Sequence, residues 1–232
     1  MSSQGQQAGT PELAQPTPEE LKDDHNHDLL DEGLKLMRAG IETIKAEQGP
    51  GQKRQWIVKR LRSLLKVMKN ALGQKSMPTN EAMIQHWDKI YYALFGRQSS
   101  ECFGNVVFEW KEDLHDWNGD KALGVSEWKD GNTTLQIKME PIAESEYQLL
   151  ETFLHEMCHA VIWYTCCMGQ CGEATCKELT KKWVHENDGH GYHWQALAET
   201  LGEYVSVLLG QKIDLKWDRD VGMAFACIVL IM

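Results

Sequence analysis

The stretch His155-Glu156-Met157-Cys158-His159 lies inside an apolar segment of the chain and decides the fold class that the sequence predicts. The apolar residues around it, over 149–162, predict a long helix over about 145–164. Two histidines four residues apart lie on one face of a helix, so both imidazoles can reach one ion, and neutral imidazole suits zinc. Burying such polar groups in an apolar helix is costly unless they are paired or metal-bound.

The same stretch supplies a candidate general base. Glu156 lies beside the histidine face, where a carboxylate can take a proton from a metal-bound water and deliver it to a leaving amine. A catalytic zinc takes three protein ligands, and the downstream candidates are His185, His190 and His193. His190 is favoured because flanking glycines let the backbone turn sharply before a last helix that begins near Gly191. We expect His185 in a surface loop and His193 on the surface of that helix.

These residues resemble a known family. HEMCHAVIW at 155–163, followed by GHGYHW at 189–194, is similar to the SprT-like zinc metallopeptidases, which include the Spartan proteases that degrade proteins crosslinked to DNA. The resemblance covers about residues 81–205, and HGxxW after HExxH is the feature that selects this family. In the family the third ligand usually follows the second more closely; here 30 residues separate His159 from His190.

The resemblance implies both a fold and an activity. The implied fold is α+β, a small zincin-like domain with a short antiparallel sheet packed on the HExxH helix. The implied cofactor is one catalytic zinc ion, with His155, His159 and His190 as ligands and Glu156 as the general base. The implied substrates are proteins, often on DNA, which fits DNA–protein crosslink repair in the nucleus.

The remaining periodicity divides the chain into regions. We expect a disordered lead over 1–27, a helical hairpin over 28–75, the SprT-like domain over 81–210 with a cysteine-containing insertion over 165–188, and a C-terminal tail over 211–232. Within the domain the pattern predicts a helix over 81–95 that Thr79 or Asn80 caps, and short strands over 105–110, 123–128 and 133–139. Asp130-Gly131-Asn132 predicts a hairpin turn between the last two strands, and the strand 133–139 could offer an edge to an extended substrate.

The second predicted helix is unusually basic. Residues 53–75 hold eight Lys or Arg and no Asp or Glu, in a chain of net charge −10. One interpretation is a solvated face that pairs with acidic residues of the preceding helix. The other is a surface that contacts the phosphates of DNA or chromatin, which would also suit a non-catalytic, zinc-stabilised binding module. The candidate DNA contacts are Lys59, Arg62, Lys66 and Lys69.

Four of the seven cysteines cluster in the insertion, at 166, 167, 171 and 176. Cys166, Cys171 and Cys176 could hold a second, structural zinc ion, although zinc sites usually show closer cysteine pairs. A disulfide and unliganded thiols are the alternatives, and the sequence leaves the three open. Cys158 is expected to be a small buried hydrophobe.

The composition restricts the classes of protein to which this chain can belong. Hydrophobic residues make up 42% of the 232 residues and charged residues 25%, and the pI of about 5.4 argues against coating nucleic acid by bulk charge. No secretory signal is visible near the first residues, so we expect an intracellular protein. The apolar run 221–232 is shorter than the roughly 20 residues of a spanning helix, which leaves a buried strand or a membrane-dipping anchor.

Overall fold

The computed structural model describes residues 27–47, 51, 54–72, 77–95, 99–100, 104–115, 122–129, 134–141, 143–165, 172–183, 190–215 and 226–227. The predicted lead, apart from His27, lies outside these residues, as does the turn predicted at 130–132.

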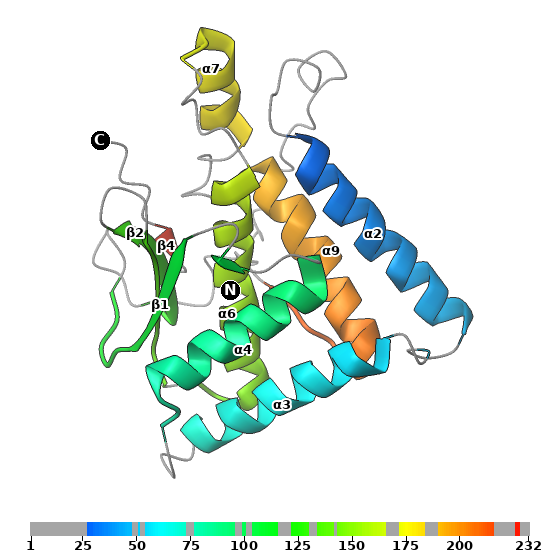
Figure 1. Cartoon of the computed structure of the whole chain (residues 1–232), viewed down its shortest axis with the longest axis vertical. Helices are drawn as coiled ribbons and strands as arrows, with labels where there is room; N and C mark the ends of the chain where they lie inside the picture. The colour runs from blue at the N-terminus through cyan, green and yellow to red at the C-terminus, as the bar shows by residue number, and fades with distance from the viewer. Residues whose placement is uncertain are drawn as a thin grey trace, which may run out of the picture.

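The described residues form a mostly helical α+β fold (Figure 1). Its helices are α2 (His27–Ala46), α3 (Gln55–Leu72), α4 (Asn80–Phe95), α6 (Glu146–Thr165), α7 (Ala174–Trp183) and α9 (Tyr192–Leu209). All but α7 were predicted from apolar spacing. The predicted cap of α4 is confirmed, because the Thr79 hydroxyl accepts a hydrogen bond from the Ala82 amide at 3.2 Å. Helix α7 was missed because it lies in the insertion, where no apolar repeat stood out.

The sheet is mixed rather than antiparallel. Its strands are β1 (Asn105–Trp110), β2 (Gly124–Lys129), β3 (Thr134–Met139) and the two-residue β4 (Ala226–Cys227), in the order β1-β3-β2-β4. β2 and β3 are antiparallel, as the predicted hairpin requires, but β1 runs parallel to β3 and β4 runs parallel to β2. The antiparallel sheet that the resemblance implied is therefore wrong: only the hairpin pair β2–β3 is antiparallel, whereas β1 and β4 join the sheet through parallel, non-local pairing.

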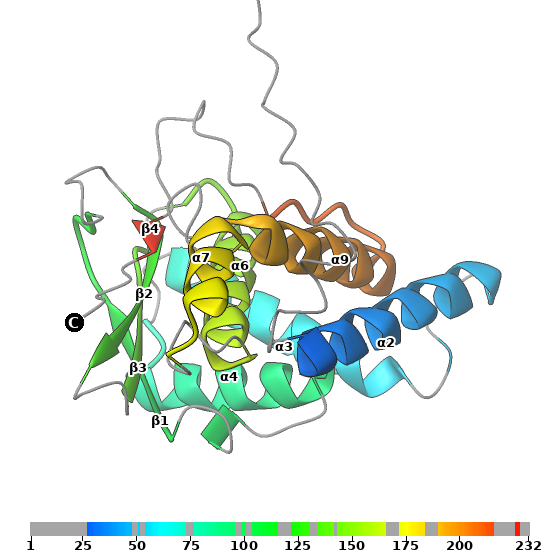
Figure 2. The same cartoon turned by 90° about the horizontal axis from the view of Figure 1, so that it is seen from above.

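Helix α6 occupies the centre of the fold. One side of it contacts β2 and β3, and its other main contacts are with α3, α9 and α2. Figures 1 and 2 show the sheet on one side of α6 and helices α9 and α2 on the other. This arrangement buries α6 on most sides, as its apolar sequence predicted.

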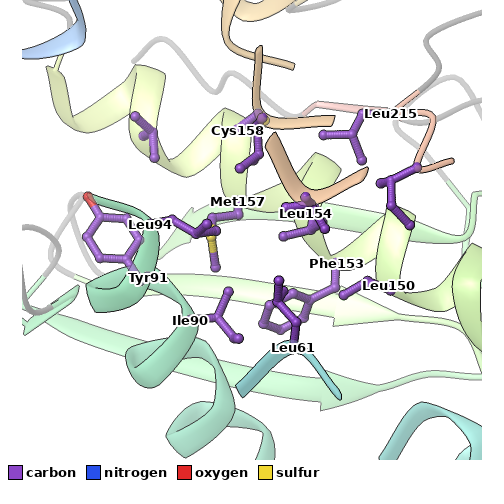
Figure 3. Close-up of a cluster of buried hydrophobic side chains, with 14 of the residues drawn as sticks. Leu61, Ile90, Tyr91, Leu94, Leu150, Phe153, Leu154, Met157, Cys158 and Leu215 are labelled. Carbon is purple, nitrogen blue, oxygen red and sulfur yellow. The ribbon is translucent and has the colours of Figure 1, made fainter. Parts of the chain in front are cut away.

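One continuous hydrophobic core joins the helices to the sheet, with buried side chains from Leu34 to Leu215. Trp87 of α4 meets Phe153 of α6 edge to face, with ring centroids 5.4 Å apart. Figure 3 shows part of this core, where side chains of α6 gather against those of α3 and α4; the residues labelled there are Leu61, Ile90, Tyr91, Leu94, Leu150, Phe153, Leu154, Met157, Cys158 and Leu215.

Helices α2 and α3 both belong to this core, and each packs mainly on the central helices. The main contacts of α2 are with α9 and α6, and those of α3 are with α6, α4 and α9. The apolar face of each helix is therefore buried against the central helices. The periodicity identified both helices correctly, but it carries no information about the partner that each face would meet.

The C-terminal apolar run contributes the short strand β4. Val125 and Ser126 of β2 pair with Ala226 and Cys227. The expected strand is therefore found at Ala226 and Cys227. The remaining residues of the run 221–232 lie outside the described residues. None of the described helices is long and apolar enough to cross a membrane.

Candidate metal site

The three histidines predicted as ligands lie together. Helix α6 places His155 and His159 one turn apart, and His190 stands just before α9, whose N-cap Gly191 has an extended backbone. The Nε2 atom of His155 lies 3.1 Å from Nε2 of His159 and 3.1 Å from Nε2 of His190. The three side chains can direct ligand atoms that all lie within 4.8 Å of one another.

These distances suit a small cation. Zinc bonds of about 2.0–2.1 Å at tetrahedral angles would separate two ligand nitrogens by about 3.4 Å. All three residues are buried, with exposed fractions of 1% for His155, 1% for His159 and 4% for His190. Burial and the neighbouring imidazoles together hold the pKa of His159 well below its ordinary value of 6.5. The uncharged imidazole that results is the form that binds a metal.

The ring of Trp194 packs against all three histidines. Its buried ring lies with centroid distances of 4.6 Å to His155, 5.3 Å to His159 and 4.4 Å to His190. The next residue, Gln195, donates a hydrogen bond of 3.1 Å from its side-chain amide to the His190 carbonyl. The first turn of α9 therefore fixes the position of His190. Residue type alone did not reveal this role, although Trp194 belongs to the quoted HGxxW motif.

Glu156 is fully buried and faces strand β2. A Cβ built on Gly124 would stand 2.7 Å from Oε1 of Glu156 and 2.6 Å from Cγ2 of Thr152, so only glycine fits at the start of this strand. Among the described residues, neither carboxyl oxygen of Glu156 has a hydrogen-bond partner. Burial raises the pKa of Glu156 to about 8, against a smaller opposing effect of the nearby Ser126.

The strand beside Glu156 is β2, and its position corrects one expectation. Strand β3 lies between β1 and β2 and pairs with both, so it offers no free edge to a substrate. Strand β2 stands closer to the site: the Ser126 hydroxyl donates a hydrogen bond of 3.4 Å to the Glu156 carbonyl. Sequence reasoning missed both Gly124 and Ser126, because nothing local indicates that β2 would pack on this helix.

The other candidates have different outcomes. Cys158 is fully buried, as expected, and burial raises the pKa of its thiol. His193 is buried rather than on the surface, because the first turn of α9 enters the core. His185 lies outside the described residues. Lys59, Arg62, Lys66 and Lys69 are exposed on α3.

The second zinc site stays a prediction. Cys176 is buried on α7, whereas Cys166 and Cys171 lie outside the described residues. In the part of the chain that the structure describes, the three histidines are the one group of three or more His, Cys, Asp or Glu arranged to hold a metal ion.

Comparison with known proteins found no matching family model, no matching curated protein and no matching solved structure. The resemblance to SprT-like metallopeptidases therefore rests on the two motifs and on their placement in the fold. What the structure itself supports is a class, an α+β protein with a buried three-histidine group able to bind a metal ion.

Proposed function

We propose that this chain is a zinc-dependent endopeptidase of the HExxH type. The observation that carries the proposal is the convergence of His155, His159 and His190, with the buried carboxyl of Glu156 next to the first ligand. Three protein ligands leave one position of a tetrahedral ion open for water or substrate, as a catalytic site requires. Without an ion, this cluster would bury several polar groups at a considerable cost in free energy.

The donor set favours zinc. All three ligands are imidazoles, whereas magnesium and calcium prefer oxygen ligands. The low pKa of His159 keeps a lone pair available at neutral pH. The resemblance of the motifs to SprT-like enzymes supports the same metal.

Glu156 is the proposed proton carrier. Zinc in this position would polarise a substrate carbonyl and make a water molecule more acidic. One carboxylate oxygen of Glu156 then accepts the proton of the attacking water and delivers it to the leaving nitrogen. Gly124 and Thr152 restrict where the carboxyl can move.

The proposed substrates are proteins. The motif resemblance extends this proposal to proteins attached to DNA and to a nuclear location. Both extensions rest on the resemblance.

The test compares wild type with Glu156→Gln on an unfolded protein substrate such as casein, with zinc content measured for both. We expect the variant to retain zinc while cleavage falls by about 10²–10⁴-fold, the usual contribution of a general base. Glu199→Gln, which changes an exposed carboxyl of α9, is the matched control and should cleave normally. Undiminished cleavage by zinc-loaded Glu156→Gln would refute the mechanism.

A second candidate is a non-catalytic, zinc-stabilised module that binds DNA or chromatin. The observation in its favour is the exposed basic face of α3. The casein experiment separates the two, since a pure binding module would bind zinc without cleaving protein in either form.

A further inference from the structure

The basic face of α3 forms a regular stripe. Lys59, Arg62, Lys66 and Lys69 are all exposed, at successive spacings of 3, 4 and 3 residues. At 1.5 Å per residue the stripe is about 15 Å long. The opposite face of α3, which includes Leu61, Leu64 and Met68, is buried in the core. The helix therefore presents its cations outward and has no free apolar face to insert into a lipid surface.

The stripe is not neutralised by neighbouring acids. Within the described ranges, none of its four cations has a carboxylate within ion-pair distance, whereas Lys45 of α2 contacts Glu203 at 2.6 Å and Glu42 at 3.8 Å. Of the interpretation in which α3 presents a solvated face that pairs with acidic residues of α2, the solvated face is present, and no pairing is found among the described side chains. Helix α2 directs its paired side chains toward α9, because that is the helix it packs on.

Helix α4 adds more positive charge beside α3, and the two helices lie side by side (Figure 1). His86 of α4 has a lowered pKa because it is partly buried and because Lys89 and Arg60 both act on it. Arg60 comes from α3 and Lys89 from α4, and both are exposed. Cations of two helices thus meet around one imidazole.

Two exposed aromatic rings accompany these cations. Trp56 of α3 is 43% exposed and Tyr92 of α4 is 50% exposed, and their ring centroids lie 6.2 Å apart. Trp56 stands one turn before Arg60, and Tyr92 stands one turn after Lys89. Large aromatic side chains are usually buried, so a pair of exposed rings beside cations that have no ion-pair partner among the described residues indicates a contact surface.

We propose that this surface of α3 and α4 binds single-stranded nucleic acid. The stripe on α3, with Arg60 and Lys89, would contact phosphates along the strand, and unpaired bases would stack on Trp56 and Tyr92. A duplex keeps its base faces inside, and an acidic peptide has no bases to stack, so the ring pair favours a single strand over both. The proposal is independent of the peptidase reaction, since none of these residues belongs to the histidine site.

The binding test uses the full chain and a labelled 20-nucleotide oligothymidine, with fluorescence anisotropy measured over a range of salt concentrations. Arg62→Glu/Lys66→Glu should weaken binding by about tenfold or more and make the salt dependence shallower by about 1.4, or about 0.7 per lost phosphate contact. Lys35→Glu/Arg38→Glu on α2 is the matched control, with the same change of net charge at exposed positions. An equal loss of affinity in this control would overturn the proposal, because it would show that net charge, and not this surface, determines binding.

The aromatic pair is tested separately. Trp56→Ala and Tyr92→Ala should each weaken single-strand binding by roughly 5- to 100-fold, the usual range for a stacked base, and change duplex binding little. Equal affinity for duplex DNA, for polyglutamate or for anionic phospholipid vesicles would overturn the choice of partner. Casein cleavage without nucleic acid should be unchanged in every variant, so a failure here is distinguishable from a failure of the peptidase proposal. Circular dichroism and thermal unfolding show whether each variant is folded.

Discussion

Helices α6 and α3 are nearly equal in length, at 20 and 18 residues, but α6 buries several polar side chains whereas α3 exposes its charged ones. Helix α6 buries His155, Glu156 and His159 almost completely. Helix α3 directs its cations into solvent and buries only apolar residues. The first arrangement costs free energy unless something compensates for it, whereas the second costs almost none.

This contrast sets how much each region can tell about function. Buried polar groups that converge on one point are costly unless something binds them, so the convergence of His155, His159 and His190 is itself an argument for a metal ion. Exposed cations cost little, so a role for α3 is inferred only because its cations have no carboxylate partner among the described residues and because two exposed rings lie beside them. Substitutions in the two regions should therefore differ sharply in their effect on stability.

The largest difference is expected between two glycines. A Cβ at either Gly124 or Gly51 would stand within 3.0 Å of a glutamate carboxyl oxygen, but Glu156 is buried while Glu47 is exposed and can move away. Gly124→Ala should lower the free energy of unfolding by about 1–3 kcal/mol, the usual cost of overpacking. Gly51→Ala should change it by less than about 0.5 kcal/mol. Urea unfolding measures both; equal effects would contradict the packing described for Glu156.

The next effect concerns pH and metal-free protein. In the folded, metal-free chain the carboxyl of Glu156 keeps its proton up to about pH 8, because its pKa is raised to about 8. In the unfolded chain the same carboxyl loses its proton near the ordinary pKa of 4.5. Between these values the folded state binds more protons, so the free energy of unfolding falls as the pH rises. Between about pH 6.5 and 8 the loss should reach about 2 kcal/mol, at about 1.4 kcal/mol per pH unit.

Glu156→Gln should remove this dependence, and Glu199→Gln should leave it in place. Urea unfolding in the presence of a chelator measures the slope for each. The pH range of the measurement stays above about 6.5 because His159, whose pKa is lowered in the folded chain, has the opposite effect on stability below that pH. There the unfolded chain binds a proton at this histidine and the folded chain does not, so the free energy of unfolding falls as the pH falls. If Glu156→Gln showed the same dependence of unfolding free energy on pH as wild type, a group other than Glu156 would be responsible for it.

The smallest effect is expected on α3. Arg62→Ala/Lys66→Ala should change the free energy of unfolding by less than about 0.5 kcal/mol, because both side chains are exposed and neither has an ion-pair partner among the described residues. Urea unfolding at low salt gives the value. A loss above about 1 kcal/mol, twice the usual surface effect, would mean that these cations stabilise the fold rather than bind a partner.

The sequence predicted most of the local structure and the ligand set. Apolar periodicity located α2, α3, α4, α6 and α9, and the HExxH spacing together with the glycines around His190 identified the three histidines that the structure brings together. These signals work because they are local: helix spacing puts His155 and His159 on one face wherever the helix packs.

The remaining features depend on pairing between distant segments. Nothing near Asn105–Trp110 indicates that this strand joins β3 in parallel, and nothing near Gly124 indicates that it must make room for Glu156. The burial of His193 and the packing of Trp194 against the three histidines likewise follow from how α9 docks on α6. Residue patterns determine which face of an element is apolar, but only the assembled core determines what that face meets.

Metal analysis of wild type and His190→Ala tests the central claim most directly, namely that one ion is held by His155, His159 and His190. Full-length chains are loaded with zinc, dialysed against buffer with a weak chelator, and assayed for zinc by mass spectrometry. We expect tightly held zinc at this site in wild type and its loss in His190→Ala, with Lys35→Glu/Arg38→Glu behaving as wild type. Wild-type zinc content and affinity in His190→Ala would contradict this claim.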